Sequence, residues 1–219
     1  MKKTLNPLTV ARGELGTTES PAGSNCVKYN TWFYGREVRD TASTKYPWCM
    51  AFVQWCFAQA GRPLPRKTAS CNDLLSWYKR YCPERVVTVP QPRDIIIYNF
   101  WHTGIVESVG VGKDAGYILA IEGNTSAGEA GNQSNGGGVF RRKRSKTLVT
   151  AYIRPYDEYE EDNDVVTYKT LDDVPSWYKP AVQKAVDKGA LKGTSGEEIN
   201  VSEDLCRTLT VLDRLGKLD

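Results

Sequence analysis

Residues 47–56, PWCMAFVQWC, decide the fold of this 219-residue chain. Their apolar side chains recur at i, i+3 and i+4, which is the spacing of one face of an α-helix. Pro47 is tolerated in a first turn, and Gly61 is a typical residue just beyond a last turn. The stretch therefore predicts a helix that carries Cys49 in its first turn.

Cys49 is a candidate nucleophile because of this position. The first N–H groups of a helix lack partners and form the positive end of its dipole, which favours a thiolate. A buried free cysteine is more often a small apolar residue of the core, and we expect this of the other five. They are Cys26, Cys56, Cys71, Cys82 and Cys206.

The only histidine of the chain, His102, is the candidate base. Residues 94–109 predict a buried strand, a short turn and a second strand, which His102 opens. A third strand is predicted at 117–126, where alternation places Glu122 and Asn124 on one face. Either side chain can accept the second ring N–H of the imidazole. Thiol, imidazole and orienting group together follow the logic of a catalytic triad.

Several segments of the chain resemble one family. They are residues 14–16, 20–25, 47–55, 102–107 and 121–125, in this order. The pattern is similar to the CHAP family, the cysteine, histidine-dependent amidohydrolases/peptidases, which are papain-like in fold and cut bacterial peptidoglycan. The resemblance covers about residues 6–155. It implies an α+β catalytic domain with an antiparallel sheet.

The resemblance also implies roles for single residues. Cys49 is expected to be the nucleophile, His102 the base and Glu122 the orienting group, with Asn124 as a fourth polar partner. Members of the family place Glu, Asp or Asn in the third role. Glu122 and Asn124 therefore both stay open for that role.

The chemistry implied by the resemblance requires no metal. Some members bind calcium in the loop before the catalytic helix, where this chain has Asn30 and Asp40. Calcium takes roughly six to eight oxygen ligands, and these two side chains are a small part of such a set. Calcium binding is therefore left open, and no other cofactor is expected.

Composition limits the size of the core and indicates the cellular compartment in which the chain is made. With 40% hydrophobic residues, the chain can hold one ordinary core and a small further module. No apolar stretch is long enough to cross a bilayer. Residues 1–7 have a basic start without the apolar region of an export signal. We therefore expect synthesis in a host cytoplasm with reduced thiols, as a phage endolysin that acts on the wall after release.

Charge is unevenly distributed along the chain. Residues 1–155 carry 21 Lys and Arg against 11 Asp and Glu, a net charge of +10, and residues 156–219 carry a net charge of −7. A basic half suits an anionic wall with peptide carboxylates and teichoic acids. The basic run at 141–144 is also typical of nucleic-acid binding, but charge runs are usually solvated. We expect an exposed hairpin there, between 139–140 and 148–153, and no nucleic-acid partner.

The C-terminal part is predicted to be a helical module at 168–219, after an acidic linker at 156–167. Ser176 and Ser202 are expected to cap its two helices, which glycines end. The module resembles an S-layer homology motif, except that acidic residues replace the usual basic triplet at the start of the second helix. This resemblance implies wall binding.

The apolar faces of the module predict a partner surface. Leu205, Leu209, Leu212 and Leu215 form a stripe that two helices alone bury only in part. We expect a second copy of the chain to cover it, which gives a homo-oligomer. The alternative is docking on the oppositely charged catalytic domain.

Three classes of function follow. The first is a peptidoglycan hydrolase, either an N-acetylmuramoyl-L-alanine amidase or an endopeptidase of the stem peptide or cross-bridge. The second is a cysteine peptidase or transglutaminase-like enzyme acting on protein. The third is a wall-binding protein that has lost activity. The presence of thiol, imidazole and carboxylate argues against the third, and the glycines and aromatics around Cys49 and His102 favour the first.

Overall fold

The computed structural model describes residues 6–40, 45–128, 135–156, 167–191 and 198–218. The chain forms two compact units, divided between Glu161 and Asp162. The predicted boundaries of the catalytic domain, linker and module stay predictions, and residues 157–166 of the linker lie outside the described residues. None of the helices in the described ranges is both long and apolar enough to span a membrane.

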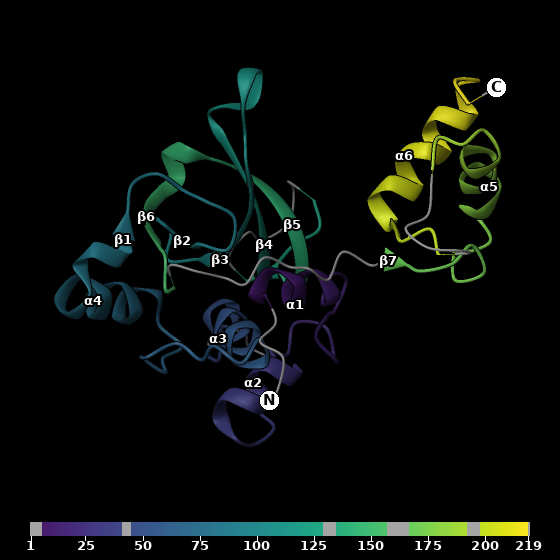
Figure 1. Ribbon diagram of the computed structural model, residues 1–219. Coiled ribbons are helices and arrows are strands. Elements are labelled where there is room, and N and C mark those ends of the chain that lie inside the picture. The colour runs from purple at the N-terminus through teal and green to yellow at the C-terminus, as the bar shows by residue number, and fades with distance from the viewer. Residues whose placement is uncertain (1–5, 41–44, 129–134, 157–166, 192–197, 219) are drawn as a thin grey trace. The chain divides into compact units, whose positions relative to one another are not determined.

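In the first unit, four helices precede the six strands of one sheet along the chain (Figure 1). The helices are α1 (Pro7–Gly13), α2 (Lys28–Tyr34), α3 (Cys49–Gln59) and α4 (Cys71–Tyr81), with 3-10 turns η1 (Pro83–Arg85), η2 (Gly112–Asp114) and η3 (Lys146–Leu148). The strands are β1 (Val86–Val87), β2 (Ile95–Tyr98), β3 (Thr103–Val109), β4 (Tyr117–Thr125), β5 (Gly138–Ser145) and β6 (Val149–Ile153). All neighbours in the order β1-β6-β2-β3-β4-β5 are antiparallel. The predicted α+β class with an antiparallel sheet is confirmed.

Helix α3 is the central helix of this unit and lies against β3 and β4. It begins at Cys49 with Trp48 as its N-cap, so Pro47 precedes the helix instead of lying in its first turn. Its residues from 49 to 54 are buried on every side, because α1 and α2 also pack against it. The helix ends as predicted, with Gly61 at a φ of +74°.

Strand β2 separates two core clusters. Ile95 and Ile97 belong to the cluster that contains α3, whereas Ile96 and Tyr98 belong to a second cluster with residues of β3, β4 and β6. This alternation follows from the strand pleat. It explains why four consecutive side chains of β2 are all buried.

The prediction of an exposed hairpin around residues 141–144 is wrong. These residues lie within β5, which pairs with β4, whereas β6 pairs with β1 and β2 at the other side of the sheet. The pleat exposes Arg141 and Lys143 and turns Arg142 and Arg144 inward, where both are 7% exposed. Half of the basic run is therefore buried instead of solvated.

The second unit contains two helices and a two-stranded sheet. Its elements are β7 (Thr167–Tyr168), α5 (Lys179–Asp187), β8 (Val201–Ser202) and α6 (Glu203–Arg214). The Ser202 side chain caps α6 by accepting the Leu205 N–H at 3.2 Å, as predicted. The prediction that Ser176 caps the first helix is wrong, because α5 begins at Lys179. Pro180 lies in the first turn of this helix, where proline is favoured.

The two helices of this unit bury a core of their own. It consists of Val174, Ala181, Val182, Ala185, Val201, Cys206 and Leu209. The predicted leucine stripe is therefore divided: Leu209 lies in the core, whereas Leu205 and Leu215 are 37% and 65% exposed. The reason is that the inward face of α6 runs through Cys206 and Leu209.

Candidate active site

The structure brings Cys49, His102 and Glu122 together. Cys49 is the first residue of α3, His102 directly precedes β3, and Glu122 lies in β4, which pairs with β3. Their exposed fractions are 5%, 0% and 0%. Three elements that are distant in sequence thus place a thiol, an imidazole and a carboxylate in a nearly water-free setting.

The imidazole of His102 is oriented by Glu122. Its Nε2 atom lies 3.0 Å from Oε2 of the carboxylate. Its other nitrogen, Nδ1, is buried and has no hydrogen-bond partner among the described residues. The Cys49 thiol also interacts with the ring and raises the pKa of His102. Nδ1 is therefore the atom placed to exchange a proton with the thiol.

The electrostatics favour a thiolate and an imidazolium. A hydrogen bond from Cys71 and the charge of His102 hold the pKa of the Cys49 thiol well below its usual range, although burial opposes this. Burial alone would lower the pKa of His102, but the Cys49 and Glu122 charges raise it to about 9. At neutral pH the proton therefore lies on the ring, and the sulfur is an anion.

Glu122 is itself held by two buried side chains. The Tyr98 hydroxyl donates to its Oε1 at 2.8 Å, and Arg144 donates from Nε to Oε1 at 2.9 Å and from Nη2 to Oε2 at 2.5 Å. Burial alone would raise the pKa of Glu122, but Arg144 and then His102 hold it below its usual value. The carboxylate therefore stays charged while it orients the ring.

Arg144 is the main functional residue that the sequence reasoning missed. The available signal was the strand alternation of residues 138–145, which places Arg142 and Arg144 on one face. We expected the whole run to be solvated, which hid this pairing. A buried arginine requires a buried partner, and Glu122 is that partner.

Asn124 occupies a different environment from Glu122. The β4–β5 register shifts between Glu122 and Thr125, which interrupts the alternation from which a shared face was predicted. Asn124 has a φ of +59°, and its Nδ2 donates to Oδ1 of Asn135 at 3.1 Å. This contact directs the Asn124 amide toward the segment after β4. The structure places the Glu122 carboxylate at the imidazole, and its role as the orienting group stays a prediction.

Two glycines allow the elements of the site to approach one another. A Cβ added to Gly104 would lie 2.7 Å from Glu122 Cγ, so β3 leaves the space that the carboxylate side chain fills. A Cβ added to Gly123 would lie 2.7 Å from the Phe52 Cβ and 2.8 Å from Trp48. The absence of both side chains sets the spacing of β3, β4 and the start of α3.

A pocket of about 280 Å³ opens directly at Cys49. It is lined by Pro47, Cys49, Ala69, Ser70, Cys71, Asn72 and Trp101. Trp101 is 57% exposed and has a φ of +57°, an uncommon conformation for a bulky residue. The nucleophile is thus reached from solvent through a small cavity with an aromatic wall. Cys71 belongs to the core cluster, as we expected, and also lies in this wall.

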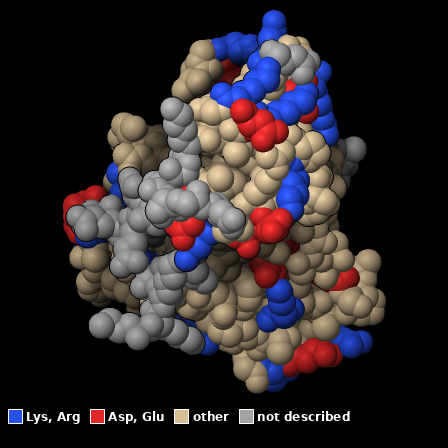
Figure 2. All heavy atoms as spheres, turned by 45° about the vertical axis from the view of Figure 1, so that its right-hand side comes forward, with Lys and Arg blue, Asp and Glu red and all other residues tan. Residues whose placement is uncertain are grey.

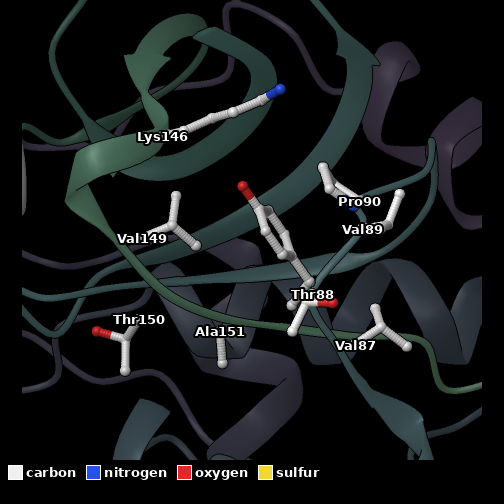
Figure 3. A pocket seen from close by; sticks show the side chains of 9 residues that line it. Val87, Thr88, Val89, Pro90, Lys146, Val149, Thr150 and Ala151 are labelled. Carbon is white, nitrogen blue, oxygen red and sulfur yellow. The ribbon is translucent and has the colours of Figure 1, made fainter. Parts of the chain in front are cut away.

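A larger hollow, of about 470 Å³, lies away from these residues at β1 and β6. Figure 3 shows its labelled side chains, among them Val87, Val89 and Val149, with Lys146 extending over the opening. Its lining contains no cysteine, histidine or carboxylate. We therefore assign the chemistry to the smaller pocket at Cys49.

The described residues do not assemble a calcium site around Asn30 and Asp40. The Asp40 carboxylate accepts the backbone N–H of Lys45, and the Asn30 amide donates to the carbonyls of Asn25 and Tyr46. The buried Oδ1 of Asn30 lacks a partner, but it is one oxygen of the roughly six to eight that calcium takes. Across the described ranges, no cluster of three or more His, Cys, Asp or Glu side chains is suited to a metal ion.

Comparison with known families gives one match. Residues 41–124 match the family model described as the CHAP domain. The comparisons with curated proteins and with solved structures gave no match. The matched range contains Cys49, His102, Glu122 and Asn124, whereas Arg144 lies beyond it. Residues 41–124 are therefore similar to a CHAP domain, and the buried thiol, imidazole and carboxylate lie inside the matched range.

Proposed function

We propose that this protein is a peptidoglycan hydrolase that cuts an amide bond of the bacterial cell wall. The observation that carries the proposal is the Cys49–His102–Glu122 arrangement within the matched CHAP domain. A zymogram on purified walls tests it: a cleared band is expected for the protein. Clearing of a casein gel without clearing of the wall gel would support the alternative, a cysteine enzyme that acts on protein.

The geometry supports the following reaction. The Cys49 thiolate attacks the amide carbonyl, and the C–N bond breaks as the His102 imidazolium donates its proton to the leaving amine. Neutral His102 then takes a proton from water, which attacks the thioester; the C–S bond breaks, the acid is released, and the thiolate and the imidazolium are restored. No side chain of the described residues caps α3, so its first N–H groups are available to bind the oxyanion.

We further propose that the bond lies within the stem peptide, in the cross-bridge, or at the junction of muramic acid with L-alanine. All three are amides that a thiolate can attack. Mass spectrometry of digested peptidoglycan distinguishes them, because an amidase releases intact stem peptides and an endopeptidase releases shortened ones. The endolysin role and its host-cytoplasmic origin stay predictions of the same proposal.

The charge distribution supports attraction to the wall over a distance. On the face drawn in Figure 2, basic side chains lie in separate groups with acidic side chains between them. Residues 1–155 carry a net charge of +10, which attracts an anionic polymer without a single recognition patch. We propose teichoic acid and peptide carboxylates as the anionic groups, and binding that weakens as salt is added.

The pH dependence of activity is predicted by the ion pair. The thiolate requires the protonated ring beside it, and the pKa of His102 is about 9. kcat/KM is therefore expected to be high at neutral pH and to fall as pH rises through about 9. Initial rates on a soluble muropeptide measure this. An alkaline limb near the ordinary histidine pKa of about 6.5 would contradict the ion pair.

For the second unit we propose wall binding combined with self-association. Helix α6 exposes Leu205, Val211 and Leu215, whereas Leu209 belongs to the core. Light scattering of the full chain at micromolar concentration is expected to give a dimer. The variant Leu205→Ser/Val211→Ser/Leu215→Ser is expected to be monomeric with the same helical content. A monomeric wild type would contradict self-association and leave wall binding or docking on the catalytic domain as the role.

A further inference from the structure

Two thiols lie in the same pocket, each at the first residue of a helix. Cys49 begins α3 and Cys71 begins α4, and each helix has 11 residues. The two side chains are 5% and 4% exposed. Both line the pocket, together with Ser70 and Trp101. The positive ends of two helices thus line one pocket, where both favour a negative charge.

The two thiols line the same pocket and interact with each other, with opposite effects on their pKa values. The same contact that lowers the pKa of Cys49 raises that of Cys71 well above its usual value, and burial adds to the rise. Only one of the two thiols is therefore ionised at neutral pH. It is Cys49, because His102 interacts with that sulfur. Cys71 keeps its proton and is left as an S–H donor toward an anion.

Cys71 is a member of the buried core cluster that contains α3, but the capping of α4 does not require it. Helix α4 is already capped by Ser70, whose side chain accepts the Asp73 N–H at 3.2 Å. A neutral S–H is a weak donor, but a hydrogen bond to an ionised group is about twice as strong as one between neutral groups. A donor at this position therefore stabilises the thiolate, which an apolar side chain of the same size does not.

We propose that Cys71 is a thiolate-stabilising residue of this site, whose S–H donates to the Cys49 sulfur from the wall of the shared pocket. It keeps the nucleophile ionised at neutral pH and holds it toward the pocket opening. When the sulfur becomes a neutral thioester, the acceptor loses its charge and this bond weakens. The inference rests on the proposed function only in taking Cys49 as the nucleophile.

The test measures the ionisation of Cys49 without any wall substrate. The full-length protein, kept reduced with a phosphine, is alkylated with iodoacetamide from pH 4 to 10, and mass spectrometry follows the peptide that contains Cys49. In Cys71→Ala the midpoint pH is expected to rise by about one unit. Cys71→Ser keeps a donor, so its midpoint is expected to stay close to that of the wild type. Cys82→Ala, at the other end of α4, is the matched control and is expected to leave the midpoint unchanged.

Unchanged midpoints in both Cys71→Ala and Cys71→Ser would overturn the proposal. If Cys71→Ala does not fold, the pair Cys71→Thr and Cys71→Val makes the same comparison, because the two side chains have nearly the same shape and only threonine carries a donor. Equal midpoints in that pair would also overturn it. A wild type that alkylates at low pH but does not cut walls would disprove the proposed function while leaving the role of Cys71 standing.

Discussion

Replacing Cys49 by alanine is expected to abolish wall hydrolysis and to leave the fold intact. The thiolate is the only attacking atom in the proposed reaction, and loss of such a nucleophile lowers the rate by a factor on the order of 10⁶. The substitution removes one sulfur atom from a site that is 5% exposed, so the free energy of unfolding is expected to fall by only about 1 kcal/mol. Turbidity loss of a wall suspension measures the rate, and thermal melting measures the stability.

Cys56→Ala is the matched control for this prediction. Cys56 lies in the same helix and is 0% exposed, and burial raises the pKa of its thiol well above the usual value. It is therefore a neutral core residue, and its replacement is expected to preserve most of the activity. Loss of activity in a folded Cys56→Ala protein, with normal activity in Cys49→Ala, would mean that the nucleophile is misassigned.

The sequence was sufficient to predict the elements that carry the nucleophile and the base. Apolar periodicity located α3, and β-branched runs located β2, β3 and β4 to within about two residues at their ends. Cys49 and His102 were identified because each stands at the boundary of such an element. The periodic part of the pattern, together with the resemblance to a family, therefore gave both the fold class and these two residues.

Other parts of the site depend on pairings that one sequence does not reveal. Arg144 acts on Glu122 because β5 lies beside β4, and Cys71 acts on Cys49 because two helix starts meet. Neither pairing has a local signature, since each depends on strand order or helix packing. The incorrect prediction of one exposed leucine stripe on α6 has the same cause. Apolar spacing identified the leucines of α6, but it does not reveal which of them α5 covers.

The burial of Arg144 changes the expected behaviour of the orienting group. Its guanidinium makes two of the hydrogen bonds to Glu122, and it is 7% exposed. Removing the carboxylate leaves a buried positive charge without its partner, which costs roughly 3–5 kcal/mol. Glu122→Ala therefore has two effects, one on the imidazole and one on folding. They have to be measured separately.

Glu122→Ala is expected to lower kcat by ~10²–10⁴, the range seen when a triad loses its orienting group, and to lower the melting temperature as well. Glu122→Gln separates the two effects, because the amide keeps the shape but loses the charge. It is expected to keep more stability than Glu122→Ala, to lower the pKa of His102 from about 9, and so to move the alkaline limb of the pH profile to lower pH.

Asn124→Ala is the matched comparison two residues along β4. It is expected to reduce the rate by a smaller factor with the alkaline limb unmoved, because the Asn124 amide donates to Asn135. A near-normal rate and pH profile for Glu122→Gln, with a large loss for Asn124→Ala, would reverse the two roles.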